Sequence, residues 1–209
     1  MKLLLVGATG LVGSNVLRLA LADARVGSVV APSRQPLLLH PKLQAPVVNF
    51  DDLPQEAEWW QADAVICTLG TTLSKAGSRQ AFQRVDHGYP LEVGRLAALH
   101  GARTYVLNSA LGADVSSRFF YNRVKGELER DLEKIGFASL TFVRPGLIVG
   151  DRPDVRRGET AAASILTLLG AVLPRRWRVN PAHKIAEALL EAAVDPMAGI
   201  HIVSSERMA

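Results

Sequence analysis

The amino-terminal segment constrains the fold of this chain more than any other part of the sequence. An apolar run at residues 2–6 has the length of a buried parallel strand. Gly7, Gly10 and Gly13 follow it at G-x-x-G-x-x-G spacing, and apolar residues then recur at helical intervals from Leu11. A strand, a glycine turn and a helix in this order are typical of a unit that binds the phosphates of a dinucleotide.

The same segment also has features of a secretory signal peptide. Lys2 precedes the apolar run, and the small residues Ala22 and Ala24 are spaced like a cleavage site. However, the core of a signal peptide is one uninterrupted apolar helix, and here three glycines and Arg18 interrupt it. We therefore expect a strand and a helix, and no targeting segment.

Each glycine of the turn has a distinct predicted use. Gly7 permits a tight turn, Gly10 lets the backbone approach a pyrophosphate, and Gly13 lets the helix lie close to the strand. The free N–H groups at the start of the helix then face the phosphates. A glycine turn without a ligand would give the same pattern, so the assignment of a ligand depends on the rest of the chain.

The composition indicates an ordinary soluble globular protein. The chain has 209 residues, of which 48% are hydrophobic and 21% charged, and a net charge of +4 with scattered basic residues. We therefore expect no nucleic-acid partner. The apolar stretch at 161–173 is too short to span a bilayer, so no membrane association is expected. Cys67 is the only cysteine, which indicates a reducing compartment, and the predicted location is cytoplasmic. The five histidines do not cluster at metal-binding spacing.

Strand-like and helix-like segments alternate along the chain. This alternation predicts an α/β fold of the Rossmann type, a doubly wound, mostly parallel sheet with helices on both faces. We expect one domain over residues 1–209, with a small C-terminal segment at about 150–180 that frames the substrate. The predicted strands are residues 3–6, 28–31, 46–50, 64–68, 104–107, 139–143 and 199–203. The predicted helices are residues 11–21, 53–60, 79–100, 119–135, 159–169 and 181–194.

Ligands of such sheets bind at the carboxyl ends of the strands, so the residues that follow each strand matter most. A site for NAD usually has an acidic residue after the second strand, whereas this chain has Arg34, whose guanidinium suits a 2′-phosphate. We therefore expect NADP(H) to be preferred, with NAD(H) left open. Asp51 could accept a hydrogen bond from an adenine amino group. Gly70 and Thr71 follow the fourth strand and could meet the cofactor.

Three residues form a candidate catalytic set. Ser109 follows the fifth strand, and Tyr121 and Lys125 lie four residues apart on the next predicted helix, where they share one face. A Tyr–Lys pair alone is common on amphipathic helices. Its position after the glycine turn, Arg34 and Ser109 favours a catalytic interpretation.

At these positions the sequence resembles the short-chain dehydrogenase/reductases. The stretches CTLGTTLSKAGS, FQRVDHGYPLE, YNRVKGELE and VRPGLIVGDRPD are similar to those of the atypical, extended-like group of Tat-interacting, CC3-like NADPH-binding oxidoreductases. The resemblance implies a catalytic Tyr121 and Lys125, which also contact the cofactor, and a catalytic Ser109. Gln35 stands where a second basic residue is common, and Asp86 is the nearest candidate for the Asn of extended members. The resemblance also implies cofactor contacts at Thr9, Gly10, Leu11, Val12, Arg34, Leu69, Gly70, Ile148 and Arg156.

The resemblance and the residues leave two functions open. One is an NADP(H)-dependent oxidoreductase that transfers a hydride to or from a small carbonyl or alcohol, with Tyr121 as general acid and base. Lys125 and a cationic nicotinamide would then lower the pKa of the phenol. The other is a redox-sensing regulator that binds NADPH and acts through a protein partner. The identity of the substrate and a homodimeric state are not readable from the sequence.

Overall fold

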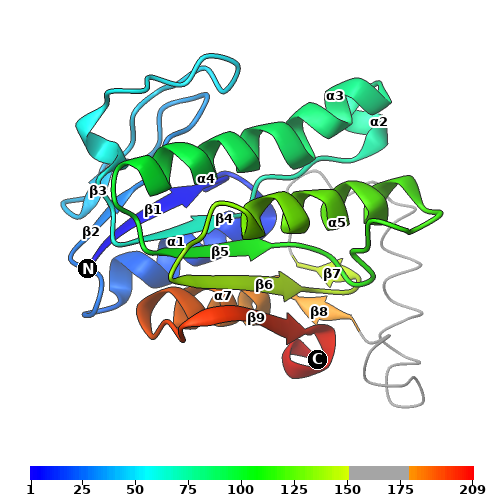
Figure 1. Ribbon diagram of the computed structural model, residues 1–209. Helices are drawn as coiled ribbons and strands as arrows, with labels where there is room; N and C mark the ends of the chain where they lie inside the picture. The colour runs from blue at the N-terminus through cyan, green and yellow to red at the C-terminus, as the bar shows by residue number, and fades with distance from the viewer. Residues whose placement is uncertain (151–178) are drawn as a thin grey trace.

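The computed structural model describes residues 1–150 and 179–209, which form a three-layer α/β domain around one parallel sheet (Figure 1). Seven strands lie side by side in the order β3-β2-β1-β4-β5-β6-β9, and every pairing is parallel. This order reverses direction between β1 and β4, which is the point where doubly wound sheets bind their ligands. The strands are β1 (Lys2–Val6), β2 (Ser28–Val30), β3 (Leu43–Gln44), β4 (Ala64–Cys67), β5 (Thr104–Asn108), β6 (Ser139–Arg144) and β9 (Gly199–Ser204).

The sheet separates two hydrophobic clusters, as expected of strands that are covered on both sides. In β1, Leu4 and Val6 contribute to one cluster and Leu3 and Leu5 to the other. The first cluster is closed by α4 (Tyr89–Leu99) and α5 (Phe120–Glu133) together with Trp60. The second is closed by α1 (Leu11–Ala22) and α7 (Ala182–Val194). The predicted fold class is confirmed.

The helix predicted at 79–100 is present but is not a regular α-helix. It consists of α3 (Arg79–Gln83), a π-helical turn η2 (Arg84–Gly88) and α4, and the short helix α2 (Leu73–Ala76) precedes it. The N–H of Tyr89 bonds the carbonyl of Arg84, five residues earlier. Pro90 explains the π turn, because it has no N–H to donate to the carbonyl of Asp86, four residues earlier.

Two predicted elements are wrong. The third strand is β3 rather than residues 46–50, where the structure has an isolated bridge between Ser33 and Val47. Pro46 lacks the N–H that a strand ladder uses at that point. Residues 53–60 form only the 3₁₀ turn η1 (Glu58–Trp60), because Pro54 disfavours a helical residue before it. The helix predicted at 159–169 lies outside the described residues.

A second, two-stranded parallel sheet lies beyond β6. It pairs β7 (Ile148–Val149) with β8 (Asn180–Pro181) and was not predicted. The fully buried Asn180 fixes this region, since its Oδ1 accepts a hydrogen bond from Gly146 N at 2.7 Å and its Nδ2 donates to Ser205 O at 2.9 Å. The 3₁₀ turn η4 (Ser205–Met208) therefore packs beside β8.

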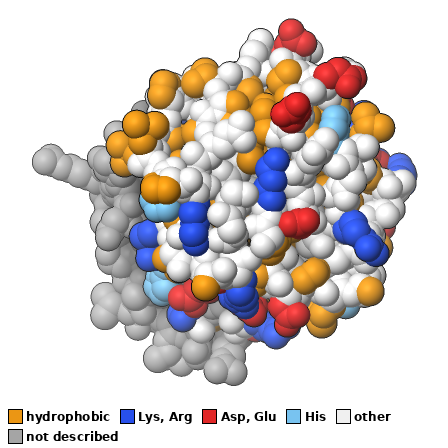
Figure 2. Space-filling model, turned by 90° about the vertical axis from the view of Figure 1, so that its left-hand side faces the viewer, with side chains coloured by type: hydrophobic (Ala, Val, Ile, Leu, Met, Phe, Trp, Pro, Cys, Tyr) orange, Lys and Arg blue, Asp and Glu red, His pale blue; other side chains and the backbone are white. Residues whose placement is uncertain are grey.

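Figure 2 shows the face of the molecule at the amino ends of the sheet strands, and this face carries charges of both signs. Lysines, arginines and acidic side chains alternate there with hydrophobic ones, and no field of one sign covers this face. In the described part of the chain, no helix is long and apolar enough to cross a membrane. The described residues likewise contain no group of three or more histidine, cysteine or acidic side chains placed to hold a metal ion.

Candidate functional site

The glycine turn joins β1 to α1 with the predicted geometry. Gly7 has φ +91°, a conformation that favours glycine. A Cβ on Gly13 would lie 2.1 Å from the carbonyl oxygen of Gly7, so only glycine lets α1 pack this closely. A Cβ on Gly10 would instead meet one atom, Gly7 O, at 3.4 Å. Gly10 therefore borders open space at the start of α1, where a ligand can approach the backbone.

The first turn of α1 is suited to an anion. No side chain caps it, and the turn contains no acidic residue. The N–H of Gly10 donates to Gly7 O at 3.0 Å, so the free N–H groups begin at Leu11, and they face outward with the positive end of the helix dipole. Val12 and Gly13 are buried behind this turn, while Thr9 is exposed beside it.

Arg34 lies beside the glycine turn, as its predicted role requires. Thr9, Arg34 and Gln35 line a small cavity of about 150 Å³. The side chain of Arg34 is exposed, and among the described residues it has no carboxylate partner within ion-pair distance. Its guanidinium is thus available to an anion that enters this cavity.

Asp51 is exposed and already engaged by two neighbours. Its Oδ1 accepts a hydrogen bond from the hydroxyl of Tyr89 at 2.8 Å and from Nη1 of Arg84 at 3.3 Å. The Tyr89 ring also contacts Phe50, with 5.7 Å between centroids. The predicted contact of Asp51 with adenine stays a prediction, and Oδ2 is the oxygen with no described partner.

The turn after β4 lies directly against a buried ion pair. Lys125 Nζ is 2.9 Å from Asp86 Oδ1, and the two residues are 2% and 1% exposed. Asp86 Oδ2 accepts a hydrogen bond from the backbone N–H of Thr71 at 2.7 Å. A Cβ on Gly70 would lie 3.4 Å from Asp86 Oδ1, so the exposed Gly70 backbone covers the pair. Leu69 packs against the core beside it.

Tyr121 lies one helical turn from Lys125 on α5, as predicted, and is 40% exposed. Its ring meets Phe82 of α3 edge-on, at 5.9 Å between centroids. Burial raises the pKa of Tyr121, the cation of Lys125 opposes this, and the charge of Asp86 adds to it, with a net increase. Desolvation therefore outweighs Lys125, and the lowering expected from Lys125 together with a cationic nicotinamide stays a prediction. At neutral pH the phenol is protonated.

Ser109 is placed differently from the expectation. It is 3% exposed, and its hydroxyl donates a hydrogen bond to Glu129 Oε1 at 2.6 Å. Glu129 in turn forms a salt bridge with Arg144, whose Nε donates to the same oxygen at 3.0 Å. The hydroxyl of Ser109 therefore belongs to a network that ties α5 to the end of β6. Its catalytic role stays a prediction.

Glu129 could have been found in the sequence. Tyr121, Lys125 and Glu129 recur at intervals of four residues, so they follow one face of α5. Extending the four-residue spacing of Tyr121 and Lys125 by one further step would have identified this acid. Asp86 was noted only as a substitute for Asn, and its ion pair with Lys125 depends on the π turn.

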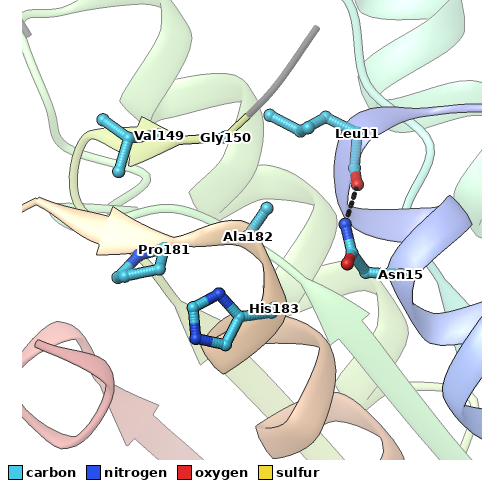
Figure 3. Close-up of a pocket in the computed structure, with 7 residues that line it drawn as sticks. All are labelled: Leu11, Asn15, Val149, Gly150, Pro181, Ala182 and His183. Atoms are coloured by element: carbon cyan, nitrogen blue, oxygen red, sulfur yellow. Dashed lines mark hydrogen bonds between the residues drawn. The ribbon is translucent and has the colours of Figure 1, made fainter.

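A larger cavity of about 410 Å³ opens beside the start of α1 (Figure 3). Asn15 donates a hydrogen bond to the carbonyl of Leu11 at its edge, at 2.9 Å. Ile148 lies next to this cavity in β7. The predicted contact at Arg156 lies outside the described residues, as does most of the proposed substrate-framing segment. The cavity is lined by Leu11, Asn15, Val149, Gly150, Pro181, Ala182 and His183.

Comparison with known proteins agrees with this architecture, although no family model matches the chain. The structure of MoeE5 in complex with UDP-glucose and NAD superposes with a TM-score of 0.74 at 18% identity, over 97% of this chain and 75% of that one. The strand order, glycine turn and Tyr121–Lys125 pair place the protein among the atypical short-chain dehydrogenase/reductases.

Two sequence relatives define the family more narrowly. Protein fmp52 of Aspergillus niger is 33% identical over 98% of this chain and 92% of its own length. Protein HTATIP2 of Rattus norvegicus is 34% identical over 93% of this chain and 82% of its own length. The chain belongs to the family of the HTATIP2 and fmp52 proteins.

The expected cytoplasmic location is contradicted by these relatives. The fmp52 proteins of several fungi are named as mitochondrial. The prediction relied on the expected absence of a targeting segment and on the single Cys67, which is buried and free in the structure. A lone free cysteine is compatible with any reducing compartment and does not single out the cytoplasm.

Proposed function

We propose that this protein is an oxidoreductase that uses NADP(H) to reduce a small carbonyl compound. The observation that carries the proposal is the juxtaposition of Tyr121, the buried Lys125 and the Gly70–Thr71 turn at the carboxyl edge of the sheet. A buried lysine held by a carboxylate next to a partly exposed tyrosine is the arrangement that proton transfer from a phenol requires.

The described residues around the glycine turn and Arg34 fit the phosphate groups of NADP(H). The uncapped start of α1 and the open side of Gly10 suit the pyrophosphate. Arg34 and Thr9 border a cavity in which a 2′-phosphate could form charge-assisted hydrogen bonds. NADP(H) is therefore the proposed cofactor, and the exposed Gln35 supplies no second cation.

The chemistry divides between the cofactor and the chain. When bound, a reduced nicotinamide supplies the hydride for the carbonyl carbon. Tyr121 donates the proton from its hydroxyl to the carbonyl oxygen, and its raised pKa keeps that proton in place at neutral pH. Lys125 stabilises the phenolate that remains.

A specific observation supports the second candidate, a dinucleotide-binding regulator without turnover. The buried hydroxyl of Ser109 donates its proton to Glu129, so it is not free to donate to a substrate oxygen beside Tyr121. A regulator would still need the glycine turn and Arg34. The two candidates therefore differ in turnover and not in cofactor binding.

The deciding experiment combines a titration with a turnover assay. NADPH and NADH are titrated against the protein by fluorescence, and NADPH oxidation is followed with a panel of aldehydes, ketones and quinones. Tyr121→Phe keeps the ring and its contact with Phe82 but removes the proton donor. We expect the variant to bind NADPH as the unmutated protein does and to lose about 10²–10⁴-fold in turnover.

Opposite outcomes separate the candidates. If the unmutated protein binds NADPH but oxidises it with no compound, and a protein partner distinguishes NADPH from NADP⁺, the regulator is correct. If neither dinucleotide binds, both candidates are wrong.

A further inference from the structure

Asp86 contacts one residue of the candidate catalytic set and one residue of the candidate cofactor site, and the proposed function gives Asp86 itself no role. One carboxylate oxygen faces Lys125 Nζ at 2.9 Å, and the other accepts the backbone N–H of Thr71 at 2.7 Å. Oδ1 accepts no other hydrogen bond from the described residues, so Lys125 is the group that compensates its charge. A single buried carboxylate thus joins α5 to the turn after β4.

The π turn is what brings Asp86 to this position. Pro90 leaves the carbonyl of Asp86 without the usual donor, and the chain accommodates this with one wider turn at η2. Such turns insert one residue into a helix and change the direction of the side chains beside it. Asp86 is the buried residue of η2, while its neighbour Arg84 reaches outward to Asp51.

We propose that Asp86 is a positioning residue for Lys125, which it holds charged and in register with the Gly70–Thr71 turn. This inference rests on the proposed function, since the turn and Lys125 are the groups offered to the cofactor. The carboxylate, and not merely a hydrogen-bond acceptor, is required, because an amide at position 86 could still accept from Thr71 but could not balance a buried ammonium.

The charges around Lys125 determine the expected pH dependence. Desolvation lowers the pKa of Lys125, but Asp86 of η2 and Tyr121 of α5 outweigh it, with a smaller contribution from Cys67 of β4. The folded pKa is therefore above the unfolded value, and the stabilisation is complete at every pH below about 10.4. Without the charge of Asp86, burial dominates and the folded pKa falls below the unfolded one.

The test is Asp86→Asn, measured by urea unfolding and by NADPH titration between pH 6 and pH 9.5. In this variant a charged Lys125 is buried without a partner at low pH and becomes neutral as the pH rises. We expect its deficit in unfolding free energy, relative to the unmutated protein, to shrink as the pH increases. We also expect the variant to lose NADPH affinity within this pH range, whereas the unmutated protein, in which the pKa of Lys125 lies above its ordinary value, should keep its affinity throughout.

A double-mutant cycle with Lys125→Met isolates the positioning role. In the Lys125→Met background, Asp86→Asn should cause no further loss of affinity and should raise stability, because Asp86 is then a buried carboxylate without its cation. Glu92→Gln removes a partly exposed acid on α4 and is the matched control, which should behave as the unmutated protein.

The outcomes separate this inference from the proposed function. A stability deficit in Asp86→Asn that is the same at every pH would overturn the inference, since it would reflect only a damaged fold. So would an equal loss of affinity with and without Lys125. If the unmutated protein binds no dinucleotide, the proposed function fails, and the unfolding data still decide whether Asp86 keeps Lys125 charged.

Discussion

Two glycines of the same turn should respond in opposite ways to alanine. A Cβ at Gly13 would lie 2.1 Å from Gly7 O and 2.6 Å from Thr68 Oγ1, distances that force the backbone of the turn or α1 to move. Overpacking of this kind costs about 1–3 kcal/mol, and a rigid backbone atom puts Gly13→Ala at the upper end. For a domain of this size, a cost of about 3 kcal/mol lowers the melting temperature by roughly 6–12 °C.

Gly10→Ala should leave stability nearly unchanged. Gly10 has φ −77° and ψ 167°, which alanine adopts freely, and its Cβ would contact only Gly7 O at 3.4 Å. The weaker helix cap costs a few tenths to ~1 kcal/mol, and the stiffer unfolded chain offsets ~0.4–1 kcal/mol. The new methyl group would stand where the pyrophosphate approaches. NADPH affinity should therefore fall about tenfold or more, or ~1.4 kcal/mol.

The assay compares both variants in thermal and urea unfolding and in fluorescence titration with NADPH. The expected pattern is lost stability in Gly13→Ala and lost affinity with intact stability in Gly10→Ala. A stable Gly13→Ala, or full affinity in Gly10→Ala, would refute the reasoning about this turn. Equal losses of stability in both variants would show that Gly10 does not border open space.

Two more predictions follow from charged side chains. Arg34→Ala should reduce the preference for NADPH over NADH by about 10- to 150-fold, which corresponds to ~1.5–3 kcal/mol for lost charge-assisted hydrogen bonds. In the same titration, the control Arg18→Ala, on the exposed side of α1, should not change the ratio of the two affinities. Hydrogen bonds from Arg25 lower the pKa of Asp23 to about 2. The ionised Asp23 therefore stabilises the folded state fully above about pH 3.9, and this stabilisation is lost as the pH falls toward 2. Urea unfolding between pH 2 and pH 5 should show that acid lowers the unfolding free energy less in Asp23→Asn than in the unmutated protein. The same dependence of unfolding free energy on pH in both proteins would contradict this.

The sequence predicted those parts of the fold that depend on local patterns. The apolar runs of β1, β4, β5 and β6 and the glycine turn have signals within a few residues, and the structure confirms them. The errors occurred where proline acted against an otherwise suitable segment, at Pro46 and Pro54. The short β7–β8 pair escaped prediction because its partners are far apart in the sequence and only two residues long.

In the candidate site, too, local sequence patterns predicted some features and missed others. The relation of Tyr121 to Lys125 follows from helical spacing, and the place of Arg34 follows from the rule on strand ends. By contrast, the bond from Ser109 to Glu129 spans two elements, and the ion pair of Asp86 needs a π turn that no periodicity predicts. Contacts of buried charged groups depend on tertiary packing. Sequence spacing therefore predicts which residues are neighbours on one helix, but not which residue of another element is their partner.

The cover that α1 and α7 provide for one face of the sheet has a consequence for biosynthesis. Strands β4 and β5 emerge from the ribosome long before α7, yet both strands contact α7, whose Ile185 and Leu189 belong to the same hydrophobic cluster. Until that helix is made, apolar strand surface remains exposed on the growing chain. The domain therefore completes this cluster only after the residues of α7 (Ala182–Val194) have been synthesised, and until then the nascent chain exposes apolar surface of the kind that promotes aggregation.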